Sequence, residues 1–159
     1  PMHLKRIFVF LLSISFSSVV LAEKTSPGDI LGFWLSAKKT GVVEISKVGN
    51  KFEGKLVWIK DIHDGKAKEK FDDNNPDDKL KKRSLMGLKM LHGFEFKKDE
   101  WTDGKIYDPE SGKTYSAFMK LESKDQLNLR GYIGISLFGR TSEWTRQKSA
   151  TPDKYTKKK

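Results

Sequence analysis

The sequence contains no cysteine. Disulfide bonds, thiolate metal sites and thiol catalysis are therefore excluded, and the fold must be held together by its hydrophobic core. Histidine is scarce too, with three in 159 residues. The chain also lacks a Gly-x-Ser-x-Gly nucleophile elbow, a phosphate-binding loop and a His-Glu-x-x-His zinc motif. These absences argue against an enzyme and against a bound cofactor.

Long hydrophobic runs are also lacking, with one exception near the start of the chain. Lys5 and Arg6 precede a serine-interrupted apolar stretch at 7–21, and Ala22 supplies a small residue before Glu23. This arrangement is typical of a signal peptide and predicts cleavage after residue 22. The alternative is an uncleaved anchor, for which the stretch is short, because a spanning helix needs roughly 20 apolar residues. We therefore expect an exported protein, either periplasmic or secreted.

Basic residues outnumber acidic ones, by 31 to 21. Lysine is interleaved with aspartate and glutamate along most of the chain, and the dense basic runs are confined to 79–83 and 154–159. Neither run has the interleaved aromatics that stack on bases. We expect no nucleic-acid partner, and only loose attraction to anionic envelope surfaces.

Alternation of apolar and polar residues dominates the rest, with turn signals every 8–12 residues. The fold class is therefore all-β: a single small antiparallel up-and-down barrel of about eight strands at 23–148. An insertion at 60–83 interrupts it, and a basic tail at 149–159 is expected to be disordered. The first strand is expected at 30–37, the last at 138–147, and a hairpin turn at Asp103-Gly104.

Residues at the two ends of the barrel domain are suited to closing it. Gly32 allows the backbone to bend, and Trp34 can plug the floor. Trp144 and Arg146 lie in the last strand, where the arginine can stack on Trp34 and donate to nearby carbonyls. We expect these four residues to have a structural role in barrel closure.

Several motifs in order resemble a family of bacterial exported proteins of uncharacterised function. The motifs run from Gly32-x-Trp34 to Trp144-Thr145-Arg146 and include these segments: Gly54-Lys55-Leu56-Val57-Trp58, Asp73-x-Asn75-Pro76-Asp77, Leu85-x-Gly87-Leu88, Ile106-Tyr107-Asp108-Pro109-Glu110-Ser111-Gly112 and Leu129-Arg130-Gly131-Tyr132-Ile133-Gly134. The resemblance implies a small periplasmic or secreted domain with a lipocalin-like barrel. Gly32-x-Trp34 with Arg146 also resembles the lipocalin signature, although a basic tail stands where lipocalins carry a helix.

Residues that could line a barrel cavity are mostly apolar or aromatic. The predicted ligand-binding residues are Trp58, Leu88, Met90, Phe94, Tyr107, Tyr115, Met119, Leu129, Arg130, Phe138 and Arg140. The two arginines are included because a guanidinium inside a barrel needs a carboxylate partner or an anionic ligand. His63, beside Asp61 and Asp64, is interpreted as a solvated loop residue, and no metal site is predicted.

The main hypothesis is a monomeric, non-enzymatic protein that carries a small hydrophobic or amphipathic ligand, such as a fatty acid, in the barrel. Period-two alternation is the same for a hollow and a filled barrel, so two alternatives stay open. A filled interior would favour an envelope protein–protein interaction module. An enzyme would require His63 or His92 to face a cavity beside a carboxylate.

Overall fold

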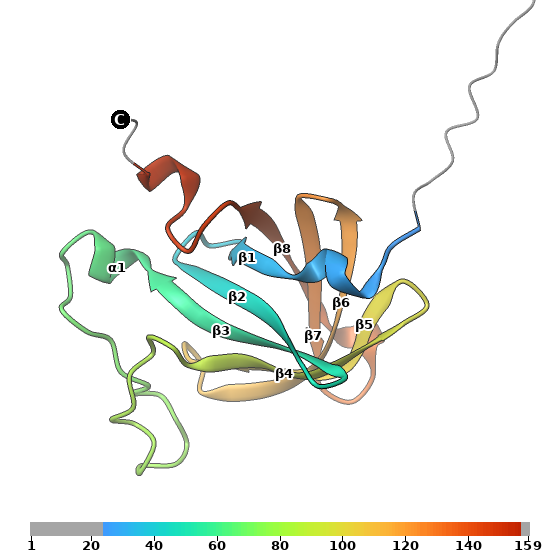
Figure 1. Ribbon diagram of the computed structural model, residues 1–159. Coiled ribbons are helices and arrows are strands. Elements are labelled where there is room, and N and C mark those ends of the chain that lie inside the picture. The colour runs from blue at the N-terminus through green and yellow to red at the C-terminus, as the bar shows by residue number, and fades with distance from the viewer. Residues whose placement is uncertain (1–23, 157–159) are drawn as a thin grey trace, which may run out of the picture.

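The computed structural model describes residues 24–156, so the predicted leader lies outside the described residues. Eight antiparallel strands form a closed barrel in which each strand pairs with its neighbours in sequence and β8 returns to β1 (Figure 1). The predicted fold class is confirmed. The strands are β1 (Gly32–Leu35), β2 (Gly41–Val48), β3 (Lys51–Ile59), β4 (Lys89–Lys97), β5 (Glu100–Asp108), β6 (Lys113–Ser123), β7 (Gln126–Tyr132) and β8 (Arg140–Gln147).

The alternation seen in the sequence corresponds to the two faces of the barrel wall. In β3, Phe52, Gly54 and Leu56 are buried, whereas the lysines at 51 and 55 are exposed. Successive side chains of a strand point to opposite faces, so one apolar set fills the interior and the polar set faces solvent. Closure between β1 and β8 pairs Trp34 with Arg146.

The connections separate the barrel into two different ends. In an up-and-down barrel alternate connections lie at the same end. The turn at 36–40, the long segment at 60–88, the turn at 109–112 and the loop at 133–139 therefore share one end, which we call the mouth. The opposite end carries the 3-10 helix η1 (Pro27–Ile30) and is called the closed end.

The predicted start of the first strand, at residue 30, is wrong. The 3-10 helix η1 occupies residues 27–30, and β1 begins at Gly32. Ser26 and Asp29 form a capping box, in which the Ser26 backbone N–H and hydroxyl donate to the Asp29 carboxylate at 2.7 and 2.8 Å. This local bonding favours a helical turn over a strand. Ile30 is consequently fully buried in the core beneath the turn.

The expected hairpin turn at Asp103-Gly104 is also wrong. Residues 100–108 form one continuous strand, and the β4–β5 turn lies at Lys98-Asp99, both with positive φ (49° and 66°). Asp103 has a φ of 58°, and the register of β5 against β6 shifts between Trp101 and Gly104. The Asp-Gly pair therefore produces a β-bulge, which requires the same left-handed backbone as a tight turn.

Two expectations near the C-terminal end need correction. The last strand begins at Arg140 rather than Phe138, which lies in the 3-10 helix η2 (Ser136–Phe138). The tail is not disordered throughout, because 153–155 form the 3-10 helix η3 (Asp153–Tyr155). The Tyr155 ring lies 5.1 Å from that of Trp58, so this segment packs against the barrel wall.

The insertion is longer than expected and extends from 60 to 88. It starts with one helical turn, α1 (Lys60–His63), and continues as irregular backbone that projects beside the barrel (Figure 1). A single bridge, between Phe71 and Ser84, ties its two limbs together. None of the helices among residues 24–156 has the length and apolar composition needed to cross a membrane.

Candidate functional site

Side chains fill the interior of the barrel. A single buried cluster includes residues from every strand of the wall, among them three predicted ligand-binding residues: Phe94, Met119 and Leu129. Packing is tight at Gly104, where an added Cβ would lie 2.3 Å from the Phe94 ring. These three residues are therefore core residues in this structure rather than the lining of an open pocket.

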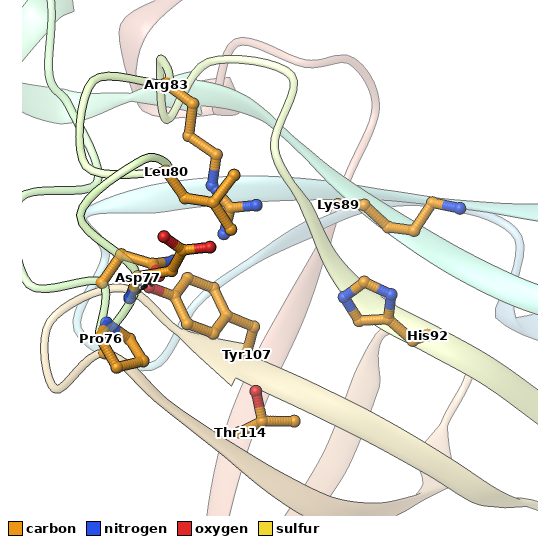
Figure 2. A pocket seen from close by; sticks show the side chains of 10 residues that line it. Pro76, Asp77, Leu80, Arg83, Lys89, His92, Tyr107 and Thr114 are labelled. Carbon is orange, nitrogen blue, oxygen red and sulfur yellow. Dashed lines mark hydrogen bonds between the residues drawn. The ribbon is translucent and has the colours of Figure 1, made fainter.

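A pocket with a volume of about 360 Å³ lies at the mouth, between the insertion and strands β4 to β6 (Figure 2). We call it the mouth pocket. Its lining residues are Asn75, Pro76, Asp77, Leu80, Arg83, Lys89, His92, Tyr107, Gly112 and Thr114. Figure 2 shows the insertion residues on one side and Lys89 and His92 on the other, with the Tyr107 ring between them. Pro76, Leu80 and the Tyr107 ring provide apolar surface beside these charged and polar groups.

A buried carboxylate holds the insertion against the barrel. Asp72 is fully buried and accepts hydrogen bonds from Tyr107 Oη at 2.5 Å, Asn75 Nδ2 at 2.7 Å and Arg83 Nε at 2.8 Å. Burial by itself would raise the pKa of Asp72, but these three donors outweigh it and hold the pKa below its usual value. Burial, followed by the hydrogen bond to Asp72, raises the pKa of Tyr107. The network thus keeps a carboxylate charged and a phenol neutral.

Asn74 and Gly112 make a second attachment between the insertion and the barrel. Asn74 Nδ2 donates to the carbonyls of Pro109 and Glu110 at 3.1 and 3.0 Å. Gly112 has a φ of 67°, and a Cβ there would lie 1.9 Å from the Asn74 carbonyl oxygen. Only glycine allows both this backbone conformation and this close approach.

Cationic and neutral donors lie together on the β4 side of the mouth pocket. Lys89 pairs with Glu53 at 2.5 Å. Across the pocket, on the insertion side, the Arg83 guanidinium lies 5.3 Å from the centre of the Tyr107 ring. Burial, followed by the charge of Lys89, lowers the pKa of His92. His92 is therefore a neutral imidazole at pH 7, which offers one donor and one acceptor.

The closed end brings together three of the four residues predicted to close the barrel. The Arg146 guanidinium lies 4.2 Å from the centre of the Trp34 ring, and it donates to the carbonyls of Leu31 at 2.8 Å and Lys124 at 2.6 Å. A Cβ at Gly32 would lie 3.5 Å from this guanidinium. Trp144 lies apart from the stack and is buried in the core, where its indole N–H donates to Ser142 Oγ.

A further concavity of about 510 Å³ lies at the closed end, beside Pro27 and Phe52. Its charged side chains include Lys51 and Glu95, which pair with each other at 3.1 Å. It has no counterpart of the buried network at the mouth. We therefore take the mouth pocket as the candidate site.

Of the predicted ligand-binding residues, Tyr107 lines the mouth pocket. Trp58 packs with Leu35 and Val42 in a separate small cluster. Leu88 is buried, and Met90 and Tyr115 are half-buried. The remaining three lie at the loop 133–139 or on the strands that flank it: Arg130, Phe138 and Arg140.

No group of three acidic or histidine side chains that could hold a metal ion occurs among residues 24–156. His63 is exposed, and its ring lies 5.5 Å from that of Trp58 and 4.9 Å from that of Tyr155. Its neighbours Asp61 and Asp64 pair with Lys70 and Lys60. His63 is thus part of an aromatic contact with Trp58 and Tyr155.

Sequence reasoning did not identify most of the mouth pocket. The sequence predicts only an insertion at 60–83, and nothing in its spacing pairs Asp72 with Arg83 or with Tyr107. His92 was named only as a residue that an enzyme would need beside a cavity and a carboxylate, and the structure places it in the mouth pocket, which Asp77 also lines. The one available signal was the length of the insertion, because long irregular segments in compact domains are often functional.

Comparison with known proteins gives a family and one solved structure. The family model described as "Uncharacterized protein conserved in bacteria (DUF2147)" matches residues 32–146. Among solved structures, the chain is similar to protein HP1028 from the human pathogen Helicobacter pylori, which is described as belonging to the lipocalin family. The TM-score is 0.64 and the sequence identity 26%, and the match covers 73% of this chain and 81% of that one. No curated protein matches. The lipocalin-like barrel expected from the sequence is thereby confirmed.

Proposed function

The chain belongs to the conserved bacterial family DUF2147, and from this premise we propose that it is an exported, non-enzymatic protein that binds a small amphipathic anion in its mouth pocket. A lipocalin-like barrel is suited to binding small molecules, although fold alone does not specify the ligand. The observation that carries the proposal is the filled interior, which leaves the mouth pocket as the place for a ligand.

The chemistry of the pocket favours a ligand with an acidic head and a short apolar body. Each of the two cations of the pocket has one carboxylate partner, Glu53 for Lys89 and Asp72 for Arg83. Their remaining N–H groups, together with neutral His92 and Thr114, can hydrogen-bond an acidic head group. Leu80 and the Tyr107 ring provide apolar surface for the body. A volume of about 360 Å³ is at the small end of typical ligand sites, which favours a medium-chain over a long-chain fatty acid.

Calorimetric titration with medium-chain fatty acids, after removal of co-purified lipid, tests this proposal. We expect saturable binding that Lys89→Met weakens about tenfold, because one charge-assisted hydrogen bond is lost while the side-chain stem is kept. Lys47→Met, on β2 near the closed end, serves as the matched control and leaves the affinity unchanged. Absence of saturable binding across the series would contradict the proposal, as would equal effects of the two variants.

Export rests on the residues at 1–22 and is tested separately. Fractionation of cells that produce the full chain, with mass measurement of the intact protein, should find it outside the cytoplasm and starting at Glu23. An intact protein that keeps residues 1–22 and is found in a membrane fraction would favour the uncleaved anchor instead.

A second candidate function is an interaction module, because a filled barrel was the observation expected to favour it. The two candidates are separated by the titration together with mass spectrometry of material that co-purifies with the protein. A bound small acid supports the first candidate, and a stoichiometric protein partner supports the second.

A further inference from the structure

The loop between β7 and β8 exposes four large apolar side chains. The exposed fractions are 71% for Ile133, 58% for Ile135, 75% for Leu137 and 78% for Phe138. We call these four residues the apolar tip. Single exposed apolar residues are common on proteins, but four within six consecutive positions of one loop are a concentration that calls for a reason.

Arg130 holds the backbone of this loop in place. Its guanidinium donates to the carbonyls of Ser136 at 2.8 Å and Leu137 at 3.1 Å and to Thr141 Oγ1 at 3.0 Å. At the end of the loop, a Cβ on Gly139 would lie 2.7 Å from the Gly131 carbonyl oxygen. Two backbone carbonyls of the loop, those of Ser136 and Leu137, are thus hydrogen-bonded while its apolar side chains remain exposed. The apolar tip therefore projects from a loop whose backbone is held by hydrogen bonds from Arg130.

The charged residues that flank the apolar tip in the sequence are positive. Of those at 126–147, Arg130 and Arg140 lie next to the loop, whereas Glu143 lies further along β8 and Arg146 belongs to the closed end. Arg130 and Arg140 flank the loop directly, and Arg140 is exposed. Guanidinium groups beside an exposed apolar loop complement the phosphates of an anionic lipid surface, where apolar side chains enter the interface and cations remain among the headgroups.

The small size of the tip favours a lipid surface over a protein partner. A stable protein interface buries about 800 Å² on each side, whereas four side chains on one short loop offer only a few hundred Å². A lipid surface accepts a small projecting loop, because binding there scales with the apolar area that is inserted together with the attraction to anionic headgroups.

We propose that the apolar tip docks the protein on an anionic lipid surface, with Arg130 and Arg140 at the headgroup level. The proposal is independent of the ligand in the mouth pocket. Because the loop 133–139 lies at the mouth end, docking would turn the mouth of the barrel toward the lipid.

Vesicle flotation of the chain from Glu23 onward, which contains every element of the described fold, tests the proposal. Vesicles of phosphatidylcholine are compared with vesicles of equal parts phosphatidylcholine and phosphatidylglycerol. We expect binding to the anionic vesicles and at least about tenfold weaker binding for the double variant Leu137→Ser, Phe138→Ser. Val48→Ser, at a 53% exposed valine at the closed end of the barrel, is the matched control and keeps full binding.

Two further measurements separate the components. Arg140→Gln should weaken binding several-fold on anionic vesicles only. In a Phe138→Trp variant, the tryptophan emission should shift to the blue when anionic vesicles are added. No shift, or equal binding by the double variant and the natural chain, would overturn the proposal. So would a tip-dependent dimer or protein complex without vesicle binding, because the occupant would then be a protein.

Discussion

At the scale of single residues, the most informative group is the Asp72 carboxylate. It is fully buried, yet three different side chains donate to it, one from β5 and two from the insertion. A buried charge is tolerated only when it is paired and hydrogen-bonded. Asp72 therefore links the stability of the protein to the position of the insertion, and through it to the shape of the mouth pocket.

The substitution Asp72→Asn should destabilise the protein by about 2–3 kcal/mol at neutral pH, because the charge-assisted hydrogen bonds weaken and Arg83 loses its partner. The pKa of Asp72 is lower in the folded than in the unfolded protein. The stability it contributes is therefore present above about pH 4, the unfolded pKa, and is lost as the pH falls through the folded value. Thermal unfolding followed from pH 6 downward should show a steeper acid loss in the natural chain than in the variant.

Asp61→Asn is the control for this comparison. Asp61 also pairs with a cation, Lys70, but both side chains are more than 40% exposed. An exposed pair contributes little to stability. An effect of Asp61→Asn as large as that of Asp72→Asn would contradict the role given to burial.

At the scale of elements, the insertion at 60–88 is held to the barrel at points far apart in the sequence. Asp72 accepts a hydrogen bond from Tyr107 in β5, which is 35 residues away. Asn74 donates to the carbonyls of Pro109 and Glu110 in the β5–β6 turn, which are 35 and 36 residues away. The Lys38–Glu110 ion pair joins the β1–β2 turn to the same region. Irregular backbone with this many attachments can form one wall of a pocket.

The substitution Gly112→Ala tests this attachment. The new Cβ would overlap the Asn74 carbonyl, and alanine also disfavours the positive φ of 67°. We expect a loss of about 2–4 kcal/mol in urea unfolding, together with weaker ligand binding at the mouth.

Gly49→Ala is the matched control, since Gly49 has a φ of 59° and open space around its Cβ position. It should show only the backbone cost, about 1 kcal/mol, and unchanged ligand binding. Equal losses of stability in the two variants would show that the close approach of the insertion contributes nothing.

At the scale of the whole molecule, the two ends of the barrel differ in kind. At the closed end, Arg146 joins β8 to the Trp34 ring and to the backbone before β1. The insertion, the mouth pocket and the apolar tip all belong to the mouth end of the barrel. Closure at one end thus leaves the other available for recognition.

The substitution Arg146→Ala should lower the free energy of unfolding by about 3 kcal/mol, because the cation–π contact and the hydrogen bonds to backbone carbonyls are lost together. Arg146→Lys should restore little of this, since an ammonium cannot reproduce a planar guanidinium that stacks and donates at once. Arg140→Ala, at an exposed arginine on the same strand, is the control. Urea unfolding of the three variants measures the difference, and a fully stable lysine variant would contradict this account of closure.

The sequence by itself determined the eight-stranded barrel and the contact that closes it. Alternation specifies strands because successive side chains face opposite sides, and Trp34 and Arg146 lie in strands that a closed barrel must pair. Even there, Asp103-Gly104 gave a bulge instead of a turn, because both need the same backbone conformation.

Only the tertiary structure decided whether the barrel is hollow, what Asp72 binds and which side of the 133–139 loop faces outward. A filled interior depends on the summed volumes of side chains from all eight strands. The alternation of apolar and polar residues carries no information about that sum. Asp72 and Tyr107 are 35 residues apart, and no local pattern connects them. Phe138 was expected in a strand and a cavity, but Arg130 holds its loop outside the barrel wall. Contacts of this kind depend on long-range packing, and so the candidate site was visible only in the folded chain.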